Sequence, residues 1–427
     1  MGVEPGMGVE PGMDEGKGRI SFGKQTFRSF KNPVFRLYFF GMLGHFASMN
    51  MQMVTGSLLI YRLTGSAAIL GAMSFAHAVP TLSLSLFGGV IADRVQKKYV
   101  LLIGQAASAV VSLGVALALT LGYLSTEHAG SWWILVVSSM LQGSIMGLMM
   151  PSRQAVIPEI VSEKQLMNAI SLNMMGMNAL QLFAPALAGF LIDAFDFKAV
   201  YYVMTGMYLM AVIFFAFLPL TGAMVNRGVS ALAGIKEGLN YARHDTIILS
   251  VLLFTLFTII LSMPYQMLMP VFADDILKVG ATGLGVLMSV SGIGSMIGSV
   301  TLASLPDKKR GLMLLTSSLV LGLALVGFSF SSTWYLSLGL IIFVGLGQVG
   351  RMTLSNTLLQ YYVKDEYVGR VMSLFVMQWG LMSFSTFAAG VLTEAIGVQW
   401  AIGGFAMVLA FLSILALVFV PRLRKLE

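Results

Sequence analysis

Twelve long apolar runs constrain the fold of this 427-residue chain more than any other feature. Each is about as long as the roughly 20 apolar residues that an α-helix needs to cross a bilayer. Several of the loops between them are short, so neighbouring spans are expected to run antiparallel. The runs cover 37–61, 66–92, 99–123, 132–151, 166–192, 198–220, 247–272, 282–305, 311–331, 333–358, 369–393 and 398–420. The pattern predicts an all-α integral membrane protein with twelve transmembrane helices.

Charge and residue counts exclude several classes of protein. Only 11% of the residues are charged, whereas a soluble domain carries roughly 25%. The chain has no cysteine, which excludes disulfides, thiolate catalysis and zinc sites built on cysteine. No catalytic or metal-ligating set stands out, and no phosphate-binding G-x-x-x-x-G-K-[ST] sequence occurs. We therefore expect no enzyme, no metal, no cofactor and no ATP drive from this chain.

The basic residues follow the alternation that sets membrane orientation. With the N-terminus placed in the cytoplasm, 23 of the 26 Lys and Arg residues fall on the cytoplasmic side. Only Arg62, Lys198 and Lys278 fall on the other side. Because loops rich in Lys and Arg stay in the cytoplasm, we expect a protein of the cell membrane with both termini on the cytoplasmic side. The net charge of +7 then reflects membrane topology, and no nucleic-acid partner is expected.

One longer loop divides the spans six and six. The predicted organisation is a disordered cytoplasmic N-terminal tail over 1–30, a six-helix half over 31–220, a cytoplasmic central loop over 221–246, a second half over 247–421 and a cytoplasmic tail over 422–427. The first tail repeats MGVEPG and has too little apolar surface to fold. Two repeated halves with a binding site at their interface are the general plan of many transporters.

The two halves are weakly repeated in sequence. Ala188-Gly189, near the end of the run 166–192, matches Ala389-Gly390 near the end of 369–393. Asp193 follows the first pair at the distance at which Glu394 follows the second. These matches place corresponding residues at the same end of corresponding spans.

A charged cluster lies between the second and third runs, and its sequence is Gly89-Val90-Ile91-Ala92-Asp93-Arg94-Val95-Gln96-Lys97-Lys98. It resembles the loop between helices 2 and 3 of the major facilitator superfamily, whose pattern is G-x-L-A-D-R-x-G-R-K. Ile91, Gln96 and Lys97 depart from that pattern. The resemblance implies a fold of two pseudo-symmetric six-helix halves and a secondary transporter.

In that family the Asp of this motif is thought to hold the two halves together on the cytoplasmic side. A carboxylate is favoured at a helix N-terminus, and here the eleventh span begins near Gly369. The resemblance therefore implies a conformational latch, with Asp307 as a degenerate second copy. Its residues would be Gly89, Asp93, Arg94, Lys97, Lys98 and Asp307. The alternative is that the basic residues only anchor the loop at the inner surface.

Three further stretches are similar to the macrolide-efflux and enterobactin-exporter branch of the family. They are Asn32-Pro33-Val34-Phe35-Arg36-Leu37-Tyr38, Leu63-Thr64-Gly65-Ser66 and Pro151-Ser152-Arg153-Gln154-Ala155-Val156-Ile157-Pro158. This likeness implies a monomeric exporter of drug, macrolide or siderophore-like molecules, coupled to protons as an antiporter. Alternatives are uptake of a metabolite, movement of lipid, and a sensor that binds a ligand without transporting it.

The run 166–192 contains Ala184-Pro185-Ala186-Leu187-Ala188-Gly189, which is similar to the G-P-x-x-G-G pattern of the family's antiporters. Proline bends a helix, and small residues let a neighbouring helix approach closely. Pro185 and Gly189 are therefore expected in a bendable contact between the halves. Gly and Pro are also common in membrane helices that have no such role.

Polar side chains inside the membrane are costly and often functional. Amides are concentrated in the spans that face the cavity in this family. The residues predicted to line the substrate path are Asn50, Gln52, His77, Gln142, Asn178, Gln181, Gln348, Arg351 and Gln378. For any one amide the alternative is a hydrogen bond between helices, worth about 0.6 kcal/mol.

A proton-coupling group is harder to assign. The first span has no acidic residue, and Ser139 stands where many proton antiporters of the family carry an Arg before the Gln142-Gly143 pair. The candidates are His77, Asp274 and Asp275, because imidazole titrates near neutral pH and carboxylates are almost absent from mid-span. Arg351 is the one arginine expected inside a span. It either binds an anionic group or extends to the inner surface.

Overall fold

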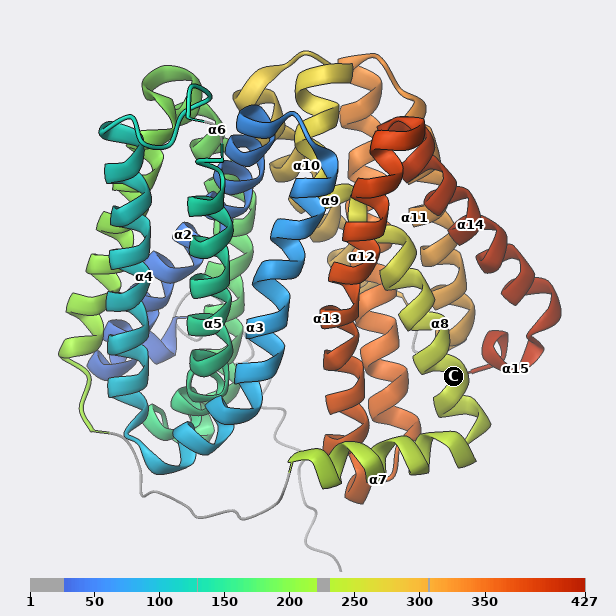
Figure 1. Cartoon of the computed structure of the whole chain (residues 1–427). Helices are drawn as coiled ribbons and strands as arrows, with labels where there is room; N and C mark the ends of the chain where they lie inside the picture. Colours follow the sequence, from blue (N-terminus) through green and yellow to red (C-terminus); the bar gives the residue numbers. More distant parts are fainter. Residues whose placement is uncertain (1–26, 129, 221–230, 306–307, 427) are drawn as a thin grey trace, which may run out of the picture.

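The computed structural model describes residues 27–128, 130–220, 231–305 and 308–426, and the helices in these ranges form two side-by-side bundles (Figure 1). The first bundle contains η1 (Arg28–Lys31), α2 (Pro33–Thr64), α3 (Ala67–Arg94), α4 (Lys97–Thr120), α5 (Trp133–Ile160) and α6 (Glu163–Ala216). The α6 segment holds two spans, because its backbone breaks at Asp196, where φ is 74° and ψ is 166°.

The second bundle follows α7 (Ala231–His244). It contains α8 (Thr246–Ser262), α9 (Pro264–Val271), the π-helical turn η2 (Phe272–Ile276), α10 (Gly280–Ser304), α11 (Arg310–Phe330), α12 (Trp334–Tyr362), α13 (Asp365–Ile396), α14 (Val398–Phe419) and α15 (Pro421–Arg424). The α8, α9 and η2 segments follow one another without a loop and form a single span.

The predicted twelve-helix fold is confirmed. Within the described ranges, ten helices are long and apolar enough to cross a membrane. One of them, α6, contains the fifth and sixth predicted spans. The polar first span, α2, completes the set of twelve with its 32 residues.

Local chemistry sets the first helix boundaries. The Asn32 side chain accepts hydrogen bonds from the backbone N–H groups of Val34 and Phe35, at 2.9 and 3.3 Å. Pro33 then occupies the first helical position, where its missing N–H is not needed. Gly65 ends α2 with a φ of 63°, which glycine adopts without a steric cost. Ser66 immediately caps α3 by accepting a bond from the Ile69 N–H.

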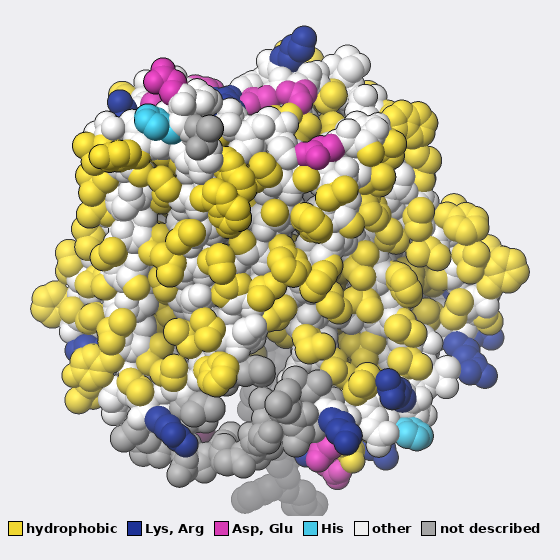
Figure 2. All heavy atoms as spheres, in the orientation of Figure 1, with side chains coloured by type: hydrophobic (Ala, Val, Ile, Leu, Met, Phe, Trp, Pro, Cys, Tyr) yellow, Lys and Arg dark blue, Asp and Glu magenta, His cyan; other side chains and the backbone are white. Residues whose placement is uncertain are grey.

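The two ends of the bundle carry different charges (Figure 2). We call the end with α7 and α15 the lower face and the opposite end, with η2, the upper face (Figure 1). Lys and Arg side chains gather at the lower face, and Asp and Glu side chains line the upper face in this view (Figure 2). An apolar belt separates the two, as expected of a multi-pass membrane protein.

Three segments predicted as loop or tail are partly folded. The 3₁₀ helix η1 packs on α6, where the Ser29 N–H donates to Asn168 Oδ1 at 3.0 Å. The first half thus begins before residue 31, and residues 1–26 lie outside the described ranges. At the other end, Leu423 of α15 and Leu426 just after it are buried, so residues 421–426 are not a free tail.

The third of these segments is α7, a helix within the predicted central loop. It lies across the lower face against the start of α13 (Figure 1). Glu237 forms an ion pair with Arg370 at 3.0 Å. The Tyr241 ring stacks on Tyr367 with centroids 4.2 Å apart. The central loop is therefore attached to the second half; residues 221–230 lie outside the described ranges.

Candidate functional site

Two helix pairs join the halves, and glycines bring them into backbone contact. In the first pair, α3 with α13, a Cβ atom on Gly71 would lie 2.7 Å from Phe387 Cα. In the second pair, α6 with α10, a Cβ on Gly189 would lie 2.2 Å from the Ala281 carbonyl oxygen. A Cβ on Gly285 would lie 2.3 Å from the carbonyl oxygen of Pro185. Pro185 and Gly189 thus lie at this interface, which tolerates no larger side chain at either glycine.

The halves are also joined by polar contacts at the upper face. The Arg62 guanidinium at the end of α2 binds the Asp274 carboxylate through two hydrogen bonds, of 2.8 and 3.1 Å. The Tyr61 hydroxyl donates to Asp275 in the same turn of η2. Asp274 and Asp275, which were proton-coupling candidates, therefore lie at the upper face and are engaged across the interface.

Two carboxylates at this face make equivalent contacts. Asp193, in α6, accepts a hydrogen bond of 2.8 Å from the Thr282 N–H in the first turn of α10. Glu394, in α13, accepts a bond of 3.2 Å from the Ala68 N–H in the first turn of α3, and another from the Ser66 hydroxyl. Each half thus supplies one carboxylate to the N-terminus of a helix in the other half. We call this pair the upper carboxylate contacts.

A helix N-terminus favours this arrangement. The first N–H groups of a helix have no partner within the helix, and the helix dipole attracts negative charge there. Asp193 and Glu394 are the acidic pair that the sequence repeat matched. The repeat did not predict what each one contacts.

The contacts between the halves are confined to the upper part of the interface. Figure 1 shows α3 and α13 converging towards the upper face and diverging towards the lower face. Among the described glycines, the lowest that contact the other half are Gly380, against Leu82, and Gly292, against Leu182. Below these residues, no hydrogen bond, ion pair or ring contact joins the halves in the part of the chain that the structure describes. Among the described residues, the contacts that join the halves therefore lie in the upper part of the interface.

Two of the predicted path residues lie on one exposed face of α6. Asn178 and Gln181 are three residues apart, and both are exposed just below the Leu182 contact. Amides in a span face the protein interior or a water-filled cavity rather than lipid. We therefore expect this face of α6 to line the space between the halves.

A polar cluster lies in the second half between α9 and α12. Gln348 Oε1 accepts hydrogen bonds from the Tyr265 hydroxyl at 3.1 Å and from Gln266 Nε2 at 3.4 Å. Arg351 lies almost one turn further along α12 and is 0% exposed. Its Nε and Nη2 atoms are buried without a hydrogen-bond partner among the described residues. The Arg351 guanidinium therefore does not extend to the lower surface.

Four other predicted path amides bind within their own half. Gln142 accepts a hydrogen bond of 3.0 Å from the Ser108 hydroxyl of α4. Gln378 donates to the Leu252 carbonyl of α8 at 3.0 Å, and Asn50 donates to the Phe46 carbonyl of its own helix at 2.8 Å. Gln52 lies over Gly56 in α2. For Gln142 and Gln378 the geometry matches the alternative of a hydrogen bond between helices.

The two histidines within helices of the first half, His45 and His77, differ in their surroundings. His77 Nδ1 lies 3.2 Å from the Ser139 carbonyl oxygen, which can only accept, so Nδ1 carries the proton. In His45, Nε2 accepts from Arg153 Nη1 at 3.0 Å, so the proton lies on Nδ1. The Gln105 amide is 2.9 Å from that Nδ1. Its oxygen must therefore face the imidazole, since amide orientations are assigned from such networks.

The cluster of His45, Gln105 and Arg153 was not predicted from the sequence. The fourth span was expected to end at Pro151, but α5 continues to Ile160 and carries Arg153 into the bundle. The Tyr38 hydroxyl donates to the Arg153 carbonyl at 3.0 Å and supports this extra turn. Arg351 is therefore not the only arginine inside a helix bundle.

Removing the partner of Arg153 should destabilise the protein. In His45→Ala, a mostly buried guanidinium loses its acceptor, which costs about 1–3 kcal/mol or more for a charged group. We expect a lower melting temperature in detergent for His45→Ala and partial recovery in His45→Ala/Arg153→Met. A double variant that is no more stable than His45→Ala would show that the hydrogen bond is not the cause.

The predicted latch is described only in part. The side chain of Asp93 and the whole of Asp307 lie outside the described residues. Lys97 Nζ forms an ion pair of 2.6 Å with Glu159, which belongs to the same half. Arg94 is exposed where α3 ends, and Lys98 is half-buried. A Cβ on Gly89 would meet nothing within 4 Å, whereas one on Gly88 would lie 2.6 Å from the Gly147 carbonyl oxygen.

Two helical bundles that meet along one interface within an apolar belt are the architecture of a membrane transporter. A model of the Major Facilitator Superfamily matches residues 38–387 and, in a second match, 266–427. The chain belongs to this superfamily, as the motif at 89–98 predicted.

Relatives and solved structures agree with this assignment. The chain is 24% identical to a staphyloferrin A transporter of Staphylococcus aureus over 78% of this chain and 83% of that protein. It is 24% identical to an enterobactin exporter of Shigella boydii over 81% and 82%. The fold is similar to a bacterial homologue of the lysosomal transporter Spinster (TM-score 0.70, 13% identity, 93% and 98% coverage). It is also similar to a POT family transporter (TM-score 0.73, 11% identity, 92% and 96% coverage).

Proposed function

We propose that this protein is a secondary active exporter of amphipathic small molecules, such as drugs, macrolides or siderophores, that works by alternating access. The observation that carries the proposal is that the described contacts between the halves are confined to the upper part of the interface, while α3 and α13 diverge below it. In a two-half carrier this arrangement is one of the two alternating states, in which the binding space opens at the lower face. The Lys and Arg side chains there favour a cytoplasmic lower face in the cell membrane.

The chemistry of the interface supports an amphipathic substrate. Asn178 and Gln181 present neutral amides from the first half. In the second half, Gln348 bonds to Tyr265, and the nearby Arg351 guanidinium is buried with its Nε and Nη2 atoms lacking a hydrogen-bond partner among the described residues. The exposed amides of Asn178 and Gln181 suit a molecule that is largely apolar and carries polar groups.

Proton coupling is the finer part of this proposal. His77 lies within α3 and engages only its Nδ1 atom among the described contacts, whereas both ring nitrogens of His45 are engaged. His77 is therefore the better-placed imidazole to exchange a proton during the cycle. Export is favoured over uptake by the named activity of the enterobactin exporter and by the Pro185 and Gly189 contact.

Inverted membrane vesicles test this function. We expect an inside-acid proton gradient to drive accumulation of a fluorescent lipophilic dye, and a transported siderophore to compete with the dye for uptake into the vesicles. Accumulation should cease when a protonophore collapses the gradient and should fall in His77→Gln, while dye binding to purified protein is unchanged. Asp93→Asn should weaken transport if the motif acts as a latch. Gradient-dependent loss of substrate from these vesicles would instead identify an uptake carrier, and binding without movement would identify a sensor.

A further inference from the structure

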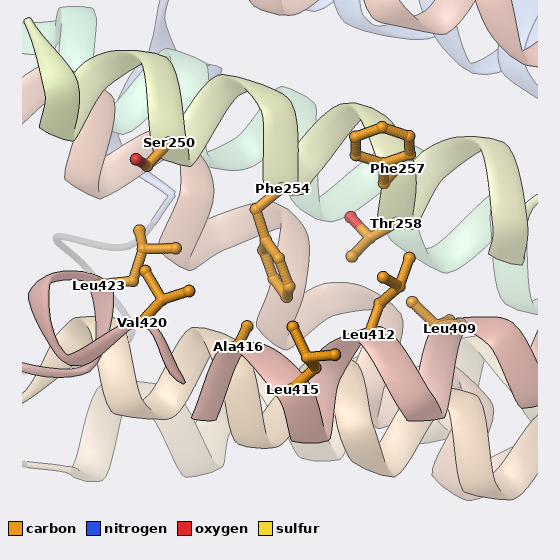
Figure 3. Close-up of a pocket in the computed structure, with 10 residues that line it drawn as sticks. All are labelled: Ser250, Phe254, Phe257, Thr258, Leu409, Leu412, Leu415, Ala416, Val420 and Leu423. Carbon is orange, nitrogen blue, oxygen red and sulfur yellow. The ribbon is translucent and has the colours of Figure 1, made fainter. Parts of the chain in front are cut away.

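A groove opens between α8 and α14 on the outer wall of the second half (Figure 3). It encloses about 230 Å³ and is lined mainly by apolar side chains, among them Phe254, Leu412 and Leu415. Phe257 at its edge is 51% exposed, so the groove faces the surrounding membrane. The Ser250 and Thr258 hydroxyls donate to carbonyls of their own helix, at 2.6 and 2.8 Å. The lining therefore offers dispersion contacts and few free polar groups, which suits a hydrocarbon chain.

The lower end of the groove is closed by α15. Val420 and Leu423 line this end (Figure 3). Figure 1 shows α14 moving away from α8 towards its lower end, where α15 follows. The segment is fixed in place, because the Gly311 N–H of α11 donates to the Leu426 carbonyl at 3.1 Å. A Cβ on Gly311 would lie 1.8 Å from the Leu423 carbonyl oxygen, so α11 and α15 are in backbone contact.

The same end of the groove is strongly basic. Arg422, Arg424 and Lys425 are exposed on and just after α15, and Figure 2 shows the dark blue side chains at this lower right edge. Arg424 Nη1 reaches back to the Leu417 carbonyl of α14 at 3.4 Å. The contact of Gly311 with Leu426 brings Lys308, Lys309 and Arg310 close to the same end. The nearest described carboxylate along α8, Asp245, is engaged in capping that helix.

We propose that the groove and α15 form a binding site for an anionic phospholipid. One acyl chain lies between α8 and α14, and the phosphate lies against Arg422, Arg424 and Lys425. A phospholipid places an apolar acyl chain in the membrane interior and an anionic phosphate at the membrane surface. It therefore matches both the apolar groove and the basic residues at the lower end of the groove. Basic pockets at helix ends on the cytoplasmic side favour anionic headgroups, and a zwitterionic lipid would leave the excess positive charge unmatched.

Native mass spectrometry of the purified, delipidated protein tests this site. Dioleoyl phosphatidylglycerol and dioleoyl phosphatidylcholine are offered together, so that only the headgroup differs. We expect the protein to retain phosphatidylglycerol in preference to phosphatidylcholine. In Arg422→Gln/Arg424→Gln the ratio of retained phosphatidylglycerol to phosphatidylcholine should fall by about tenfold or more, because each basic residue raises the affinity for an anionic surface by about fivefold. The control Lys31→Gln/Arg36→Gln removes the same charge from the lower face of the first half, where both residues are exposed.

Two further measurements distinguish the contribution of the lipid acyl chain from that of the headgroup. Ala416→Phe fills the groove and should reduce retention of both lipids at this site, whereas glycerol 3-phosphate should not displace phosphatidylglycerol. Equal retention of the two lipids by the unmodified protein would overturn the proposal. So would a preference that survives in Arg422→Gln/Arg424→Gln or falls equally in the control. Displacement by glycerol 3-phosphate would identify a site for a free phosphate instead.

Discussion

Gly285→Leu should abolish transport while leaving the protein folded in the membrane. The new side chain would begin 2.3 Å from the carbonyl oxygen of Pro185 in the opposite half. Neither backbone can move within its own helix, so the halves must separate at the upper face. A carrier that cannot close this face cannot complete its cycle, and we expect at least a hundredfold lower rate of substrate accumulation in inverted vesicles.

Gly339→Leu is the matched control for this variant. Gly339 is also a helical glycine of the second half, but a Cβ there meets nothing within 4 Å. It should retain transport close to that of the unmodified protein. Normal transport by Gly285→Leu, with normal expression of both variants, would show that the upper interface need not close.

Asp193→Ala/Glu394→Ala should shift the protein from its upper-closed state towards an upper-open state. Each substitution removes a carboxylate that accepts a hydrogen bond from a backbone N–H in the first turn of a helix in the other half. Hydrogen bonds to charged groups are worth about 1.5–3 kcal/mol when buried, and the exposure of both side chains reduces this. We expect the ratio of closed to open molecules to fall by roughly tenfold for the pair.

Electron–electron double resonance measures this shift directly. The natural chain has no cysteine, so labels placed by Tyr123→Cys and Tyr335→Cys report only the upper separation of the halves. Both native side chains are exposed, at 63% and 85%. Glu127→Ala removes an exposed acid from the upper loop of the first half and should leave the distance distribution unchanged. A distribution unaffected in Asp193→Ala/Glu394→Ala would mean that Arg62 and the glycine contacts hold the closed state without these carboxylates.

The sequence predicted the features that depend on local pattern. Hydropathy located the spans, and the motif at 89–98 indicated the family that the comparisons confirm. The weak repeat paired Asp193 with Glu394 before either had a known contact. These predictions succeeded for one reason. The length of a span and the correspondence between the two halves can both be determined from the spacing of residues along the sequence.

The partners of polar side chains could not be predicted in the same way. Arg62 and Asp274 are 212 residues apart, and no local pattern couples them. Whether Gln142 faces the path or Ser108 depends on the rotation of α5 about its axis, which hydropathy does not determine. Arg153 was missed because proline usually ends a helix, whereas α5 continues past Pro151 under the packing of its neighbours. The side chain of Asp93 lies outside the described residues, and its latch role stays a prediction.

Two distances measured on the same molecules test alternating access most directly. The upper pair is Tyr123→Cys with Tyr335→Cys, and the lower pair is Met167→Cys with Gln360→Cys, all at exposed positions. In lipid nanodiscs without substrate, we expect a single short upper distance and a long lower distance. Addition of a transported dye, or the change Asp193→Ala/Glu394→Ala, should lengthen the upper distance and shorten the lower one in the same proportion of molecules. Two distances that change independently, or a lower distance that stays long in every condition, would contradict the alternating-access account.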